Sequence, residues 1–197
     1  MTEGRSSSRV GKIAATPRVA TPTRGPKRVP GEMKTADFLT GLLDQTRARL
    51  PAELGECQTF QRWSLAKLWF DDAAIHYEVA PHTSRGRIEV ALHFETRNPR
   101  HNAAMLEYFV EELLFLKAAL GERLEAEPWD KGWTRVYLTL PLEALLPDFQ
   151  QRVASYLAEF VETLEPILRD AAESVRGMGA VSATATATID PNGMLSS

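Results

Sequence analysis

The stretch that most constrains the fold runs from residue 71 to residue 97 and holds two alternating runs of apolar and polar residues. Successive side chains of a β-strand point to opposite faces. Each run therefore predicts a strand with one apolar and one polar face, as in a sheet that is buried on one side. The apolar faces carry Ile75, Tyr77, Val79, Ile88, Val90, Leu92 and Phe94, and the polar faces carry His76, Glu78, Arg87, Glu89, His93 and Glu95.

A turn at residues 83–86 joins the two runs into a hairpin, and its length sets the register of the strands. A two-residue loop pairs His76 with Glu95 and Glu78 with His93. A four-residue loop pairs His76 with His93 instead. Opposite charges that face each other across a strand pair contribute roughly 0.2–1 kcal/mol each, so we expect the two-residue loop.

The rest of the chain predicts three helices and three more strands. Apolar residues recur at helical spacing in three segments, at about residues 36–50, 99–120 and 147–165. An alternating run predicts one strand over residues 60–70, and a second hairpin turns at residues 130–132 with Glu127 opposite Arg135. The predicted fold is α+β, a single antiparallel sheet with the order α-β-β-β-α-β-β-α. The second helix has a broad apolar stripe, which predicts packing on more than one side and a subunit interface.

Both ends of the chain differ in composition from its middle. Residues 1–34 are rich in Ser, Thr, Pro, Gly and Arg, and residues 171–197 are mostly small or polar. Such segments cannot bury enough apolar surface to offset the entropy of ordering them. We therefore expect two disordered tails around an α+β domain at residues 35–170.

The charge of the chain is divided unevenly. Residues 1–34 carry a net charge of +6, whereas the whole chain of 197 residues carries −3, so residues 35–197 carry −9. The basic segment predicts contact with nucleic acid or another acidic partner, or else a solubilising extension.

The sequence predicts a cytoplasmic protein that does not enter a membrane. No apolar run approaches the length of a membrane span, and the N-terminus lacks the apolar core of a secretory signal. The one cysteine, Cys57, cannot form an internal disulfide, which is typical of a reducing compartment.

Two metal sites can be considered on the polar face of the first hairpin. His76, Glu78, His93 and Glu95 are residue types that bind zinc, although the same residues also suit a solvated face of ion pairs. The order α-β-β-β-α-β is also similar to the core of PD-(D/E)XK nucleases, which use acidic residues and a lysine to hold Mg²⁺ and activate water. The matching positions would be Glu78, Glu95 and Arg97, but an arginine cannot lose its proton near neutral pH. We expect a binding protein rather than an enzyme, and no cofactor.

The second hairpin carries the strongest indication of binding. Trp129, Trp133 and Tyr137 fall on its polar side together with Arg135. Tryptophan, tyrosine and arginine dominate the hot spots of protein interfaces. These residues therefore predict a surface for a protein partner, unless a helix covers them.

The element order and the acidic body resemble the type III secretion chaperone fold and the related YbjN-like proteins. The resemblance covers the folded part of the chain and rests on element order and charge; the basic residues 1–34 are not part of the pattern. It implies a homodimeric binding protein without catalysis. We therefore expect a protein-binding or adaptor domain that pairs with a second copy through its second helix or its sheet.

Overall fold

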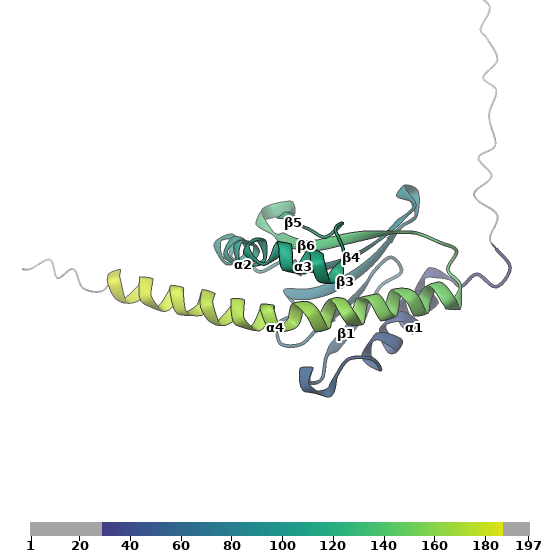
Figure 1. Cartoon of the computed structure of the whole chain (residues 1–197), viewed down its shortest axis with the longest axis horizontal. Helices are drawn as coiled ribbons and strands as arrows, with labels where there is room; N and C mark the ends of the chain where they lie inside the picture. Colours follow the sequence, from purple (N-terminus) through teal and green to yellow (C-terminus); the bar gives the residue numbers. More distant parts are fainter. Residues whose placement is uncertain (1–28, 187–197) are drawn as a thin grey trace, which may run out of the picture.

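A single six-stranded antiparallel sheet forms the centre of the protein, so the predicted α+β class is confirmed (Figure 1). The computed structural model describes residues 29–186, with side chains described as far as Arg176. The disorder expected for the two ends falls, at residues 1–28 and 187–197, outside the described residues.

The strands follow the sheet order β1-β2-β3-β4-β6-β5 and are β1 (Gln58–Gln61), β2 (Ala66–Trp69), β3 (Ile75–His82), β4 (Arg87–Phe94), β5 (Glu125–Pro128) and β6 (Thr134–Pro141). The helices are α1 (Thr35–Arg47), α2 (Pro99–Glu111), α3 (Leu113–Leu120) and α4 (Pro147–Thr186), with single turns η1 (Ala52–Leu54), η2 (Thr83–Arg85) and η3 (Asp130–Gly132).

The two faces of the central hairpin, β3 and β4, are those that the sequence predicts. Tyr77 and Phe94 are 1% and 0% exposed and point into the core. Phe94 packs against Phe109 of α2 with ring centroids 5.6 Å apart, and Tyr77 meets Phe160 of α4 edge to face. The polar side chains of both strands therefore lie on the other face of the sheet.

The predicted register of this hairpin is wrong by a shift of two residues. Ile75 faces Phe94, and His76 faces His93 rather than Glu95. The reason is the loop: Thr83–Arg85 forms one turn of 3₁₀ helix, and Gly86 closes it in the left-handed region at φ 61°. This makes the four-residue loop, and the expected pairing of opposite charges across the strands is lost.

The single strand predicted over residues 60–70 is in fact a hairpin. β1 and β2 are joined by a tight turn, in which the Arg62 N–H donates to the Leu65 carbonyl at 2.9 Å. Trp63 sits at the tip of the turn and is 80% exposed. The turn contains neither Gly nor Pro, so the sequence has no turn signal there and its alternating pattern predicts a single strand. The observed order has four strands before α2 instead of three.

The predicted helix over residues 99–120 is present but broken in two. Asn98 caps α2, because its side-chain oxygen accepts from the backbone N–H groups of Arg100 and His101. The helix is interrupted at Glu112, whose ψ of 0° departs from helical geometry, and α3 then begins at Leu113. The break lets Leu116 and Leu120 of α3 reach the core.

The second hairpin, β5 and β6, has the predicted register. Glu127 faces Arg135, and Ala126 faces Val136. Lys131 and Gly132 both take left-handed backbone angles, which closes the predicted three-residue loop.

Helix α4 is longer than predicted, since it continues through residue 170 to Thr186 (Figure 1). Pro166 lies inside it without ending it. This proline is exposed, so water can bond the carbonyl that its missing N–H leaves free. The helix thus crosses residue 170, where the sequence predicts the end of the domain.

One apolar core joins the sheet to all four helices. Phe38 of α1 stacks on Phe149 of α4 at 5.7 Å, and α2 and α3 contribute residues such as Phe109 and Leu116. Since all four helices contribute to the core on the apolar face, none of the described helices covers the polar face. We call this polar side of the sheet the open face.

Candidate functional site

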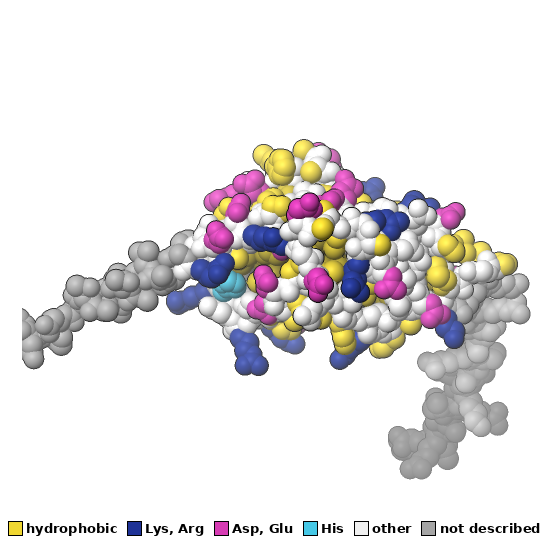
Figure 2. Space-filling model, turned by 90° about the horizontal axis from the view of Figure 1, so that it is seen from below, with side chains coloured by type: hydrophobic (Ala, Val, Ile, Leu, Met, Phe, Trp, Pro, Cys, Tyr) yellow, Lys and Arg dark blue, Asp and Glu magenta, His cyan; other side chains and the backbone are white. Residues whose placement is uncertain are grey.

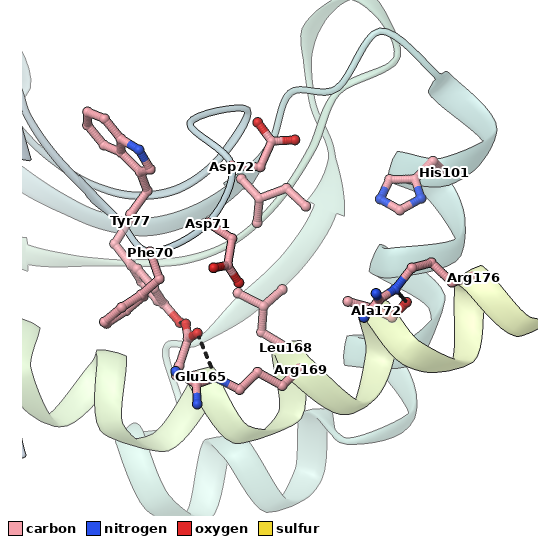
Figure 3. Close-up of a pocket in the computed structure, with 12 residues that line it drawn as sticks. Phe70, Asp71, Asp72, Tyr77, His101, Glu165, Leu168, Arg169, Ala172 and Arg176 are labelled. Carbon is pink, nitrogen blue, oxygen red and sulfur yellow. Dashed lines mark hydrogen bonds and ion pairs between the residues drawn. The ribbon is translucent and has the colours of Figure 1, made fainter. Parts of the chain in front are cut away.

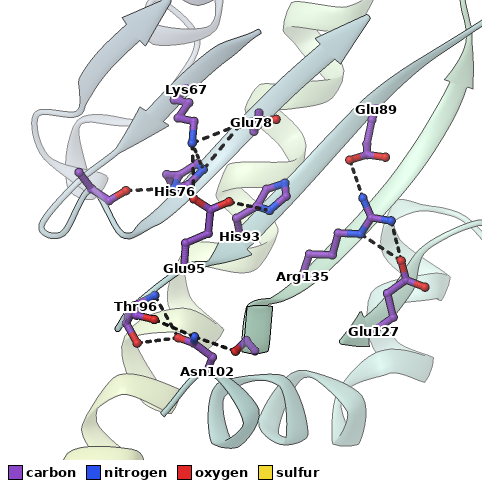
Figure 4. A network of polar contacts seen from close by, with 12 residues as sticks. Lys67, His76, Glu78, Glu89, His93, Glu95, Thr96, Asn102, Glu127 and Arg135 are labelled. Atoms are coloured by element: carbon purple, nitrogen blue, oxygen red, sulfur yellow. Dashed lines mark hydrogen bonds and ion pairs between the residues drawn. The ribbon is translucent and has the colours of Figure 1, made fainter. Parts of the chain in front are cut away.

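The open face carries two clusters of polar side chains, each organised around one cation (Figure 4). The first surrounds Lys67 of β2, which pairs directly with Glu78 of β3. The Lys67 ammonium nitrogen lies 3.3 Å from Glu78 Oε2, 3.7 Å from Glu95 Oε2 and 2.8 Å from His76 Nε2. Three residues singled out in the sequence are thus brought together by a lysine that the sequence did not indicate, because it belongs to another strand.

The contacts of His76 fix the position of its proton. An ammonium group can only donate, so Nε2 of His76 accepts from Lys67. Nδ1 then carries the proton and donates to the Ala73 carbonyl at 3.0 Å. In this tautomer the ring is uncharged, so its contact with Glu78 at 3.8 Å is not an ion pair.

His93 stacks on His76, with ring centroids 5.4 Å apart and planes inclined by 10°. It is 3% exposed, and neither ring nitrogen has a hydrogen-bond partner among the described residues. Burial, helped by the charges of Lys67 and Arg135, lowers the pKa of His93 to about 4, although Glu78 acts in the opposite direction. His93 is therefore neutral at neutral pH, which explains why two histidines can face each other here without repulsion.

Glu78 provides negative charge to this cluster. Burial raises the pKa of Glu78, but the interactions of its carboxylate with this cluster, among them the positive charge of Lys67 at 3.3 Å, outweigh burial and leave the pKa below its usual value. The carboxylate and the Lys67 ammonium therefore neutralise each other on the open face.

The residues considered for zinc, His76, Glu78, His93 and Glu95, lie around a lysine. The Lys67 ammonium contacts three of them. Within residues 29–186, no group of three or more His, Cys, Asp or Glu side chains is arranged to hold a metal ion. The donor set is an internal ion-pair network.

The residues considered for Mg²⁺ are only partly brought together. Glu78 and Glu95 both face Lys67, as just described. Arg97 lies beyond the end of β4, is exposed, and forms no ion pair with either carboxylate in the described part of the chain. The geometry therefore brings the two carboxylates together beside a lysine and leaves Arg97 apart from them.

The second cluster surrounds Arg135 of β6. Its guanidinium lies between the rings of Trp129 and Tyr137, 3.6 and 3.8 Å from their centroids. It also donates to Glu89 Oε1 at 2.8 Å and to Glu127 Oε1. Arg135 and Glu89 are both 5% exposed. Arg135, which the sequence predicts to bind a partner, thus has its positive charge paired with carboxylates of the same domain.

The four residues predicted for partner binding, Trp129, Trp133, Tyr137 and Arg135, do lie on the same hairpin, and no described helix covers them. Trp129 is 43% exposed, whereas Trp133 and Tyr137 are partly buried. Burial and the hydrogen bond to Glu125 raise the pKa of Tyr137 to about 12, so its hydroxyl stays protonated. Only Trp129 presents a large free surface.

A pocket of about 420 Å³, which the sequence does not predict, lies between the β2–β3 turn, α2 and α4 (Figure 3). At its wall the Tyr77 hydroxyl donates to Glu165 Oε2 at 2.9 Å, and Arg169 contacts the other carboxylate oxygen at 3.2 Å. Burial raises the pKa of Glu165, which is 2% exposed. Figure 2 shows a hollow in the surface with apolar side chains at its floor and charged side chains around it. In the sequence, the one sign of this pocket is Glu165, a glutamate that falls within the apolar stripe of α4.

Three of the exposed large apolar side chains in the described part of the chain lie on α2 and α3. Val110, Leu114 and Phe115 are 49%, 85% and 61% exposed, and we call them the α2–α3 patch. A groove of about 250 Å³ beside the patch is lined by Tyr108, Glu112, Phe115, Ile167 and Asp170. The patch corresponds to the broad apolar stripe that the sequence predicts for the second helix.

Comparison with protein-family models, curated proteins and solved structures finds no match to this chain. The likeness to type III secretion chaperones and YbjN-like proteins therefore remains a prediction. None of the helices within residues 29–186 has the length and apolar character needed to cross a membrane.

The buried ion pair of Arg135 is expected to be far more costly to break than an exposed one. Arg135→Gln leaves Glu89 buried without its partner and should lower the free energy of unfolding by about 3 kcal/mol. Arg152→Gln is the matched control, because its pair with Glu143 at 2.6 Å is more than half exposed and should contribute less than about 1 kcal/mol. Urea denaturation of both variants measures the difference, and equal losses would contradict this account.

His93 is expected to make stability depend on pH. Its pKa of about 4 lies below the ordinary 6.5, so the unfolded chain binds a proton more readily, and stability present above pH 6.5 is lost as the pH falls toward 4. Between pH 7.5 and 4.5 the wild type should lose about 2.5 kcal/mol of unfolding free energy relative to His93→Gln. Denaturant titrations across this range test it; a wild-type-to-variant difference that is constant with pH would be the contrary result.

Proposed function

We propose that this protein is a non-catalytic protein-binding domain that works as a homodimer, and that the α2–α3 patch receives its partner. The observation that carries the proposal is the exposure of Leu114 and Phe115, at 85% and 61%, beside a groove between α3 and α4. Exposed contiguous apolar surface of this kind marks interaction sites on folded proteins.

The position of the α2–α3 patch explains why the domain itself does not bury it. The break at Glu112 turns Leu116 and Leu120 of α3 into the core, so Leu114 and Phe115 of the same short helix point away from it. An isolated apolar residue at the surface is common, but three large ones within two turns of chain are a surface that another protein can cover.

The charges around the patch indicate what kind of partner fits. Glu107, Glu111 and Glu112 are exposed on α2 or at its end, and Asp170 lines the groove. A partner segment that combines apolar anchors with lysine or arginine side chains would match both the patch and its acidic rim. A strongly acidic segment would be repelled.

The open face supports the non-catalytic part of the proposal. The charges of Lys67 and Arg135 are neutralised by carboxylates within the domain, and His93 is neutral and buried. On the open face, the carboxylates of Glu78, Glu95, Glu89 and Glu127 each contact one of these two cations. The resemblance to type III secretion chaperones and YbjN-like proteins implies the same kind of role, a homodimeric binding protein.

The test compares two lysine substitutions at exposed apolar positions. Full-length Leu114→Lys should retain at least tenfold less of the proteins that the immobilised wild type captures from its own cell extract, as measured by quantitative mass spectrometry. Val29→Lys is the control, since Val29 is also an exposed apolar residue, at 45%, but lies outside the α2–α3 patch. Val29→Lys should retain the same proteins as the wild type.

Two results would contradict the proposal. The first is equal capture by the wild type and Leu114→Lys. The second is Mg²⁺- or Mn²⁺-dependent cleavage of DNA by the purified protein that disappears in Glu95→Ala, which would establish catalysis instead.

A further inference from the structure

The two edges of the sheet differ in how they are protected against pairing with another strand. Edge strands of natural proteins are usually shielded by charges or proline. β5 has both, with Glu125, Glu127 and Pro128 in its four residues. β1 has neither, since its sequence is Gln-Thr-Phe-Gln and Phe60 is 43% exposed.

Two residues of β1 have backbone groups that point away from the sheet. The Arg62 N–H donates to the Leu65 carbonyl, so these residues form a hydrogen-bonded pair. Hydrogen-bonded and non-hydrogen-bonded pairs alternate along antiparallel strands. Phe60 therefore bonds to β2, whereas the N–H and C=O groups of Thr59 and Gln61 point outward, and β2 is the only described strand that pairs with β1.

We infer that a second copy of this chain pairs with β1, antiparallel, about a two-fold axis that passes through Phe60. In this register Thr59 of each copy faces the partner subunit's Gln61, so all four outward groups of both residues are bonded. Phe60 faces the partner subunit's Phe60 in a non-hydrogen-bonded pair, where side chains are closest. The two six-stranded sheets then form one continuous sheet.

The charges at the two ends of β1 complement each other in this arrangement. Glu56 precedes the strand, Arg62 follows it, and both are exposed. Antiparallel pairing about Phe60 places Arg62 opposite the partner subunit's Gln58 and diagonal to the partner subunit's Glu56. Diagonal neighbours across strands lie within reach of long side chains. A parallel arrangement would instead place like charges together.

The same register brings Trp63, at the tip of the β1–β2 turn, close to a pocket of the partner subunit. Trp63 is 80% exposed. With Phe60 on the axis, Trp63 lies opposite the partner subunit's Cys57. A pocket of about 420 Å³ adjoins Cys57 in each copy and is lined in part by Leu50 and Pro51. Trp63 of each copy therefore docks into the pocket of the other.

This inference rests on the proposed function, in which the protein works as a homodimer, and it assigns the second copy to the sheet edge and not to the α2–α3 patch. Sedimentation equilibrium of the full chain over a range of concentrations tests it. The wild type should be a dimer that dissociates on dilution. Phe60→Glu and Phe60→Lys should each weaken self-association at least tenfold, because like charges then face each other across the axis. An equimolar mixture of the two variants should restore the dimer.

Two further variants locate the contact. Trp63→Ala should weaken the dimer at least tenfold, and Leu114→Lys should leave it unchanged. Thermal denaturation confirms that each variant is folded, as expected for side chains that are 43% exposed or more.

The inference is overturned by a wild type that stays monomeric, by charge variants that dimerise as the wild type does, by a mixture that does not reassociate, or by a dimer that Leu114→Lys dissociates. These outcomes are distinct from failure of the proposed function. A monomeric protein whose partner capture still depends on Leu114 would overturn only the pairing at β1.

Discussion

The burial of Tyr77 and Phe94 under the helices is the constraint on which the rest of the structure depends. These two rings are 1% and 0% exposed and fix which way β3 and β4 face. Because side chains alternate along a strand, the histidines and glutamates between them must all lie on the other side. That side has no described helix over it, so its polar groups have to be satisfied by one another and by water.

The open face meets this requirement with two internal cations. Lys67 contacts the carboxylates of Glu78 and Glu95, and Arg135 joins Glu89 to Glu127 between two aromatic rings. A buried charge without a partner costs several kcal/mol, whereas a paired one is tolerated. The clusters that suggest metal binding or catalysis in the sequence thus hold the sheet surface together. The α2–α3 patch is the surface that we propose for partner binding, and the edge of β1 is the one that we infer for the second copy.

The faces of both hairpins could be predicted because each depends on local alternation of apolar and polar residues. The register of the first could not, because the charge argument assumed a charged His93, and burial by residues on other strands keeps this ring neutral. The turn at Trp63 was missed for lack of Gly or Pro. Lys67 was missed as the centre of a cluster because β2 approaches β3 only in the folded sheet.

Helix boundaries were predicted well where capping residues determine them and poorly where tertiary packing does. Asn98 caps α2 through its side chain, as its sequence position suggests. The last helix was predicted to end at about residue 165, just before Pro166, but the exposed position of this proline lets α4 continue to Thr186. The break at Glu112 has no local sequence signature, although it is what exposes Leu114 and Phe115.

The central claim is that β3 and β4 pair with His76 directly beside His93, as neutral stacked rings on the open face. Nuclear Overhauser contacts between histidine ring protons, recorded at neutral pH on the full chain, test this most directly. The account predicts a contact between the rings of His76 and His93, whose centroids are 5.4 Å apart, and none between His76 and the side chain of Phe94 on the opposite face. Absence of the His76–His93 contact, with His76 instead close to the Glu95 side chain as its cross-strand partner, would contradict it.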